Sequence, residues 1–333
     1  MADEPVVLGV DVGGTKVAVA AVNGATASDL VQRPTPVSST SELLNGIEAT
    51  VREAITATGD PAAIGVGVPS QIDYGRGTVE TSVNIPLTGV PLRDELGKRF
   101  GVPVFVDNDA NCAALAEAQL VDDPPATHLV MLTLGTGVGG GVVIDGKIFR
   151  GADGLGAELG HFPIEAEGPL CPGNCPNRGC VEALCSGTAL ERDATEHAKD
   201  LPRTRLGNVY GEKGTVSGPD VVSAAEDGDT DALLLFERFG RYLGVAISGY
   251  VNVFQPHIFV IGGGLSRASG LFLERAIAEA ESRALPALWK RVDVHLARGG
   301  ADAGVIGAGL LAAQEIGRDT QRSAATTSTE GRA

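Results

Sequence analysis

Two glycine-rich turns between apolar segments constrain the fold of this chain more than any other feature. The first turn is Asp11-Val12-Gly13-Gly14-Thr15-Lys16, between the apolar runs 6–10 and 17–22, a pattern typical of strand, tight turn, strand. About 120 residues further on, Gly135-Thr136-Gly137 separates the apolar runs 128–134 and 138–144 in the same way. Two similar units in one chain predict a duplicated α/β architecture.

The segments around these turns alternate between helical and strand patterns. Helical spacing is found at 43–55, 110–120, 231–253 and 271–285, and short buried strands are predicted at 64–68, 104–106, 258–261 and 292–296. Such alternation favours a mostly parallel sheet. Beyond Gly317 the sequence is polar and has no period, which predicts a disordered tail over 318–333.

Composition restricts the class of protein. The chain has 333 residues, 43% of them hydrophobic, and 42 acidic against 26 basic side chains give a net charge of −16. This charge repels polyanions, so nucleic acid is not an expected partner, and only five residues precede the first predicted strand, too few for a DNA-binding helix-turn-helix. No apolar run reaches the roughly 18 residues of a membrane span and no secretory signal is visible. We therefore expect a soluble cytoplasmic protein with no membrane partner.

The first glycine turn has the chemistry of a phosphate site. Glycine lets backbone N–H groups approach an anion, Thr15 and Lys16 add donors, and the Asp11 carboxylate is suited to a hydrated Mg²⁺. The alternative is a hairpin turn that needs glycine for a positive φ. The second turn favours the phosphate interpretation, because two such hairpins can clamp one nucleotide. A third cluster, Gly262-Gly263-Gly264, follows a strand, where α/β folds bind ligands.

Asp107-Asn108-Asp109 follows a predicted strand and begins a helix. One interpretation is a helix N-cap with acidic residues that suit the helix dipole. The other is catalytic: a sugar hydroxyl that attacks a phosphoryl group must lose its proton to a base, and Asn108 can hydrogen-bond the same sugar.

One histidine and three cysteines form a metal-ligand pattern, with His161 followed by Cys171, Cys175 and Cys180. An imidazole and three thiolates complete a tetrahedral Zn²⁺ site, against the alternative of incidental buried thiols. Four protein ligands indicate a structural ion, which would fix a loop that carries Glu158 and Glu182.

Together these motifs resemble the ROK family of sugar kinases and related repressors, from about residue 6 to about residue 316. DVGGTK resembles the first phosphate loop of the family, DNDANCAALAE its catalytic segment, LGTGVGGGVVIDGK its second phosphate loop, and GLGAELGH with the cysteines its signature and zinc loop. There are two departures. Three residues separate Cys171 from Cys175, two more than usual, and Ser70 stands where the family commonly has glycine.

The resemblance implies an actin-like (ribonuclease H-like) duplicated α/β fold with two domains around a nucleotide and sugar cleft. We expect an N-terminal domain over 1–115, joined by a C-terminal helix at about 303–317, and a larger C-terminal domain over 116–302 with a zinc loop at 161–182. A homodimer or homotetramer is expected.

The resemblance also implies roles for individual residues. Asp109 is expected to be the catalytic base. The residues expected to bind the sugar are Asn84, Asn108, Asp109, Glu158, His161 and Glu182. Those expected around ATP are Asp11, Gly13, Gly14, Thr15, Lys16, Thr136 and Gly137 at the phosphates and Gly263 and Gly264 near the adenosine. The zinc ligands would be His161, Cys171, Cys175 and Cys180.

The activity implied is phosphorylation of glucose by ATP and Mg²⁺, with Zn²⁺ as a structural ion. Alternatives are kinases for N-acetylglucosamine, N-acetylmannosamine or fructose, because selectivity depends on a few contacts around one hydroxyl or acetamide. Polyphosphate is a less favourable donor, since a chain of net charge −16 has no evident basic track for a polyanion. A sugar-sensing regulator without catalysis is the alternative from another class.

Overall fold

The computed structural model describes residues 6–121 and 125–330, and contacts divide the chain into two compact units. Unit 1 comprises Met1–Thr127, Gly141–Ala157 and Arg298–Ala333, and unit 2 comprises His128–Gly140 and Glu158–Ala297. This division differs from the expected boundary between 115 and 116. Helix α3 (Asp109–Leu120) belongs entirely to unit 1 because it packs along helix α11 (Ala303–Glu330), and 141–157 also returns to unit 1.

Unit 1 contains a mixed sheet in the order β3-β2-β1-β5-β8, with β4 also paired to β2. Strands β1 and β2 form the antiparallel hairpin around the first glycine turn, while β5 runs parallel to both β1 and β8. The strands are β1 (Val7–Val12), β2 (Lys16–Asn23), β3 (Thr26–Ala27), β4 (Val31–Pro34), β5 (Ala63–Val68) and β8 (Val104–Asn108). A separate hairpin pairs β6 (Ser70–Asp73) with β7 (Thr78–Ser82).

Helices cover both faces of this sheet. Because side chains alternate along β1, Leu8 and Val10 pack on one face in a core with α1 (Thr40–Thr58) and α2 (Leu92–Phe100). The opposite face packs against α3 and α11. On that face a Cβ added to Gly9 or Gly65 would collide with the α11 backbone, so glycine allows α11 to lie directly on the strands.

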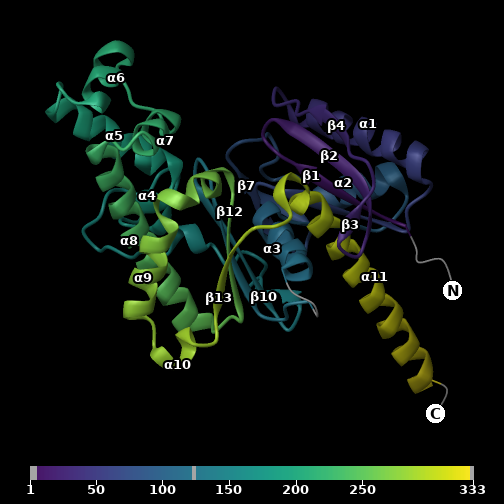
Figure 1. The fold of residues 1–333 in the computed structure, drawn as a ribbon. Helices are drawn as coiled ribbons and strands as arrows, with labels where there is room; N and C mark the ends of the chain where they lie inside the picture. Colours follow the sequence, from purple (N-terminus) through teal and green to yellow (C-terminus); the bar gives the residue numbers. More distant parts are fainter. Residues whose placement is uncertain (1–5, 122–124, 331–333) are drawn as a thin grey trace. The chain divides into compact units, whose positions relative to one another are not determined.

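The second sheet has the order β11-β10-β9-β12-β13. Its strands are β9 (Leu129–Leu134), β10 (Val138–Ile144), β11 (Lys147–Ile148), β12 (Ile258–Gly262) and β13 (Asp293–Leu296). Strand β12 is parallel to both β9 and β13, as β5 is to β1 and β8. The order β10-β9-β12-β13 thus repeats β2-β1-β5-β8, which confirms the predicted duplication. Figure 1 labels β1 and β2 of the first sheet and β10, β12 and β13 of the second.

Unit 2 is rich in helices: α4 (Val181–Cys185), α5 (Gly187–Asp200), α6 (Arg205–Lys213), α7 (Gly218–Glu226), α8 (Thr230–Phe254), α9 (Leu273–Arg283) and α10 (Pro286–Trp289). Short 3₁₀ turns lie at Leu159–His161 and Gly264–Leu271 here, and at Gly300–Asp302 in unit 1. None of the described helices is both long and apolar enough to cross a membrane.

Helix α11 extends to Glu330, past the end at about residue 317 that was expected for the C-terminal helix, and so covers most of the segment 318–333. The tail lacks proline, and after Gly317 it has no glycine before Gly331, so nothing breaks a helix that unit 1 has already nucleated. Residues 331–333 lie outside the described part of the chain.

Candidate active site

The turn from β8 into α3 holds two of the predicted site residues, Asn108 and Asp109. Asn108 is the N-cap: its Oδ1 accepts from the backbone N–H of Ala110 at 2.9 Å and of Asn111 at 3.2 Å, and its Nδ2 donates to the carbonyl of Ser70 at 3.3 Å. Asp109 is the first residue of the helix and is partly buried. Burial raises its pKa, and a hydrogen bond from Ala110 N–H opposes this. The N-cap interpretation is therefore confirmed, and Asn108 retains one N–H for a ligand.

A second carboxylate of unit 1, that of Asp11, lies at the end of β1. Burial, followed by repulsion from Asp109, raises its pKa to about 6, although Lys16 opposes the shift. Because the charge of Asp109 acts on Asp11, the two carboxylates lie in the same part of unit 1. Asp11 also lies against the first turn of α11, where a Cβ added to Gly304 would lie 2.7 Å from Asp11 Cγ.

The first glycine turn does not need glycine for its own backbone geometry. Gly13 N–H donates to the carbonyl of Lys16 at 2.9 Å, which closes the hairpin, and neither Gly13 nor Gly14 has a positive φ. A Cβ on Gly14 would meet no atom within 4 Å. The alternative of a turn that requires positive φ is thus wrong. Gly14 and Thr15 leave an exposed stretch of backbone that a phosphate can approach closely.

The second glycine turn is held by side chains of unit 2 that lie far away in sequence. Glu182 Oε2 accepts from the backbone N–H of Val138 at 2.8 Å, and a Cβ on Gly137 would collide with this carboxylate. Gly187 N–H donates to the Gly135 carbonyl at 2.7 Å. Glycine at 137 therefore makes room for Glu182, one of the predicted sugar ligands, beside a predicted phosphate turn.

The two glycines of the third cluster have different roles. Gly263 has φ +84° and a Cβ there would collide with the Leu134 backbone, so this glycine is required by the fold. A Cβ on Gly264, in contrast, would meet nothing within 4 Å. Of the pair, Gly264 is the residue whose missing side chain leaves space for a ligand.

His161 and the three cysteines lie together as predicted. One ligand atom from each of His161, Cys171, Cys175 and Cys180 lies within 4.8 Å of all the others, and His161 Nδ1 is 3.4 Å from Cys171 Sγ. Tetrahedral zinc with Zn–S of about 2.3 Å and Zn–N of about 2.0 Å separates its ligands by about 3.5–3.8 Å, so the cluster fits the ion. Burial and the neighbouring thiols raise the pKa of Cys171, which a bound dication would reverse.

Glu158 and Asn84 are exposed. Glu158 precedes the 3₁₀ turn that carries His161, and its carbonyl accepts from His161 N–H at 3.0 Å. The residue before it, Ala157, has φ +65°, a strained conformation for a residue with a side chain. Asn84 lines a cavity of about 470 Å³ in unit 1, together with Thr40, Ser82 and neighbouring residues.

The predicted residues therefore fall into two sets. Unit 1 holds Asp11, the first glycine turn, Asn84, Asn108 and Asp109, and unit 2 holds the second and third turns, Glu158, His161, Glu182 and the cysteines. Sequence reasoning did not identify Thr188, whose Oγ1 donates to the Thr136 carbonyl at 2.9 Å. Ser186 before it is a recognisable N-cap of α5, but no local signal indicates that this helix begins beside residue 136.

Comparison with known proteins gives consistent matches over nearly the whole chain. Residues 7–315 match the ROK family. A glucokinase of Thermotoga maritima is 37% identical over 313 residues, which cover 93% of this chain and 98% of that protein. An N-acetyl-D-glucosamine kinase of Vibrio cholerae is 33% identical and covers 91% of this chain and 98% of its own length.

Solved structures agree with these matches. A ROK hexokinase from Thermus thermophilus has a TM-score of 0.81 at 34% identity, covering 94% of this chain and 99% of that one. A ROK family glucokinase from Streptomyces griseus, in complex with glucose and AMPPNP, has a TM-score of 0.76 at 32% identity, covering 93% and 99%.

Proposed function

Because the chain belongs to the ROK family, we propose that it is an ATP-dependent hexokinase that phosphorylates glucose to glucose 6-phosphate. The observation that carries the proposal is Asp109: a partly buried carboxylate of raised pKa at the start of α3, in a chain that matches glucokinases over nearly its full length. A base of this kind is what a sugar hydroxyl needs when it attacks a phosphoryl group.

In the proposed reaction Asp109 accepts the proton of the attacking hydroxyl while the γ-phosphoryl group moves from ATP to the sugar oxygen. Its raised pKa favours this role, because a more basic carboxylate takes the proton more readily. Phosphoryl transfer requires little covalent chemistry from the protein, so alignment of hydroxyl and phosphate supplies most of the remaining rate acceleration.

The sugar is held by hydrogen bonds from both sets of residues. Asn108 donates its remaining N–H, and Glu182 accepts through Oε1 because Oε2 already holds Val138 N–H. His161 directs Nδ1 toward the cysteines and leaves Nε2 for a hydroxyl. Glu158 and Asn84 complete the proposed set. Several ligands on one sugar fix which hydroxyl reaches Asp109.

ATP enters as the magnesium complex. We assign its phosphates to the turns at Gly13–Lys16 and Gly135–Gly137, with Thr15, Lys16 and Thr136 as donors, and the adenosine to Gly263 and Gly264. Asp11 is the proposed contact to hydrated Mg²⁺, whose charge would offset the repulsion between Asp11 and Asp109. His161, Cys171, Cys175 and Cys180 would hold a structural Zn²⁺ that orients the imidazole and its loop.

A coupled assay of ADP release with ATP and Mg²⁺ tests the proposal across glucose, mannose, fructose, N-acetylglucosamine and N-acetylmannosamine. We expect the highest kcat/KM with glucose. Folded, zinc-loaded protein that turns over none of these sugars would refute the kinase assignment and favour a sugar-binding regulator. Sub-micromolar, salt-sensitive binding to duplex DNA would support that regulator.

A second candidate is a kinase for N-acetylglucosamine. The observation in its favour is the relative of that name from Vibrio cholerae, whose identity of 33% is close to that of the glucokinases. The same assay separates the two, because an acetamide at C2 and a hydroxyl require different contacts. We further propose a cytoplasmic enzyme, where ATP is abundant and thiols stay reduced, that assembles as a homodimer or homotetramer.

A further inference from the structure

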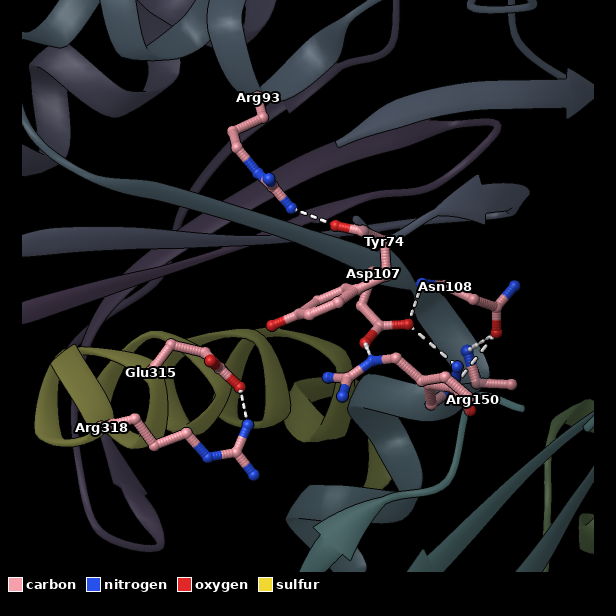
Figure 2. A network of polar contacts seen from close by, with 9 residues as sticks. Tyr74, Arg93, Asp107, Asn108, Arg150, Glu315 and Arg318 are labelled. Carbon is pink, nitrogen blue, oxygen red and sulfur yellow. Dashed lines mark hydrogen bonds and ion pairs between the residues drawn. The ribbon is translucent and has the colours of Figure 1, made fainter. Parts of the chain in front are cut away.

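Asp107 is a buried carboxylate that the proposed mechanism does not use. It is 2% exposed and accepts three hydrogen bonds: from Arg150 Nε at 2.6 Å, from Asn111 Nδ2 at 2.9 Å and from its neighbour Asn108 N–H at 2.8 Å. Figure 2 shows the contacts of the Asp107 carboxylate with Arg150 and Asn108. A buried charge without a partner is strongly unfavourable, so Asp107 and Arg150 depend on one another.

Asp107 accepts hydrogen bonds from residues on both sides of the proposed base in the sequence. Asp109 lies between Asn108 and Asn111, and Asp107 binds the backbone of the first and the side chain of the second. Asn108 in turn caps the helix through the N–H groups of Ala110 and Asn111. The first turn of α3 is thus cross-linked on both sides of Asp109, and little freedom remains for its backbone.

Arg150 is itself held in place from another part of unit 1. It is 12% exposed, and its guanidinium carbon lies 3.8 Å from the centroid of the Tyr74 ring. Arg93 donates to the carbonyls of Tyr74 and Gly75, which fixes that turn after β6. The chain just beyond Arg150 packs equally closely, since a Cβ on Gly154 would lie 2.6 Å from Tyr74 N.

Arg150 is also a cation in a region of negative charge. The pKa of the neighbouring Cys112 thiol reflects these charges. Burial raises this pKa most, and the carboxylates of Asp107, Asp11 and Asp109 raise it further, whereas Arg150 lowers it. Three carboxylates therefore act on the interior around Cys112, and the charge of Arg150 opposes them there.

We propose that the Asp107–Arg150 pair is a positioning device for the catalytic base, which fixes the turn that carries Asp109 and offsets the negative charge around it. Neither residue touches the reacting atoms, so both are positioning residues. The inference rests on the proposed function, because that function assigns Asp109 its role as base.

Steady-state kinetics of Asp107→Asn, Arg150→Gln and the double variant test the proposal. We expect each single change to lower kcat by at least about tenfold while the KM values for glucose and ATP stay within about threefold, since orientation is lost and binding is kept. The double variant should be no slower than the slower single variant, because both changes break the same pair. Single variants whose KM values rise by the same factor as their kcat falls would overturn the proposal.

Arg150→Lys and Arg76→Gln complete the experiment. Lysine restores the charge without the planar donor geometry, so Arg150→Lys should be at least about threefold faster than Arg150→Gln. Arg76 is the matched control: it lies near Tyr74, its side chain is 78% exposed and it is 3.5 Å from Asp73, so Arg76→Gln should keep kcat within twofold.

The outcomes separate the inference from the function. If Asp107→Asn does not fold, the two Arg150 variants test the proposal alone. An Arg150→Lys enzyme with a kcat no higher than that of Arg150→Gln would then contradict the proposed role of the pair. A folded Arg150→Gln with kcat within twofold of the unmodified enzyme also contradicts it. Lack of turnover in the unmodified enzyme refutes the proposed function instead.

Discussion

Asp109 is the residue on which the proposed chemistry depends most directly. Asp109→Asn preserves the shape of the side chain and removes the base, so kcat should fall by about 10²–10⁴-fold while glucose binding, measured by calorimetry, is retained. Asp94→Asn is a matched control, because Asp94 is an exposed acid in the first turn of α2. An Asp109→Asn enzyme that keeps more than about a tenth of kcat would remove Asp109 from the base role.

Asp11 carries a prediction about stability. Its pKa is about 6 in the folded protein, against 3.8 as its ordinary value, so the folded state favours the protonated form. Preferential protonation of Asp11 in the folded state stabilises the fold. This stabilisation is complete below pH 3.8 and is lost as the pH rises through 6. Relative to a neutral residue, ionised Asp11 therefore destabilises the free enzyme by about 3 kcal/mol at pH 8.

Asp11→Asn should raise the melting temperature at pH 8 by several degrees and change it little at pH 4, although phosphoryl transfer slows. Thermal unfolding at both pH values checks this, with Asp29→Asn, a change at an exposed acid, as the control. A melting temperature for Asp11→Asn that falls equally at both pH values would contradict the shifted pKa.

Close packing of helix α11 against its neighbours depends on glycine at particular positions of the helix. A Cβ on Gly307 would collide with the Cys112 backbone of α3, whereas a Cβ on Gly317, further along the same helix, meets nothing within 4 Å. Gly307→Ala should lower the free energy of unfolding by about 2–3 kcal/mol, because α3 and α11 must separate. Gly317→Ala should raise it by up to about 1 kcal/mol, from helix propensity alone.

Denaturant titrations of the two glycine variants measure the contrast. Since Asp109 begins α3, Gly307→Ala should lower kcat as well, and Gly317→Ala should not. Equal stabilities for the two variants would mean that α3 and α11 do not pack as closely as described.

The cysteine loop carries a prediction about metal content. Elemental analysis should find about one zinc per chain, and Cys180→Ser should lose most of it together with several degrees of melting temperature. Cys185→Ser is the control, because Cys185 is equally buried but is not in the cluster. Metal-free protein with unchanged stability and activity would contradict the zinc proposal.

At the scale of the whole molecule, the features predictable from sequence are those with a local pattern. The glycine turns between apolar runs predicted the duplicated sheet, and the spacing of His161 and the cysteines predicted their cluster. The unit boundaries were not predictable in this way. They depend on α3 packing against α11, nearly 200 residues later in the chain, and on the return of 141–157 to unit 1.

The same reason explains the missed polar network. Asp107 and Arg150 are 43 residues apart, and neither stands in a pattern that distinguishes a buried ion pair from two exposed charges. The sequence likewise could not separate Gly263, which the backbone requires, from Gly264, which leaves open space. Both distinctions arise only when distant segments are packed together.

The net charge of −16 leads to the last prediction, which concerns the phosphate donor. A long polyphosphate must hold many phosphates near the protein, whereas ATP needs only the glycine turns and one hydrated Mg²⁺, so repulsion penalises the polymer far more. We expect kcat/KM with polyphosphate to be at least about 100-fold below that with ATP. The ratio between the two kcat/KM values should become smaller at higher salt, because salt screens the charges. Comparable rates with both donors at low salt would show that a local basic track, rather than the net charge, governs donor choice.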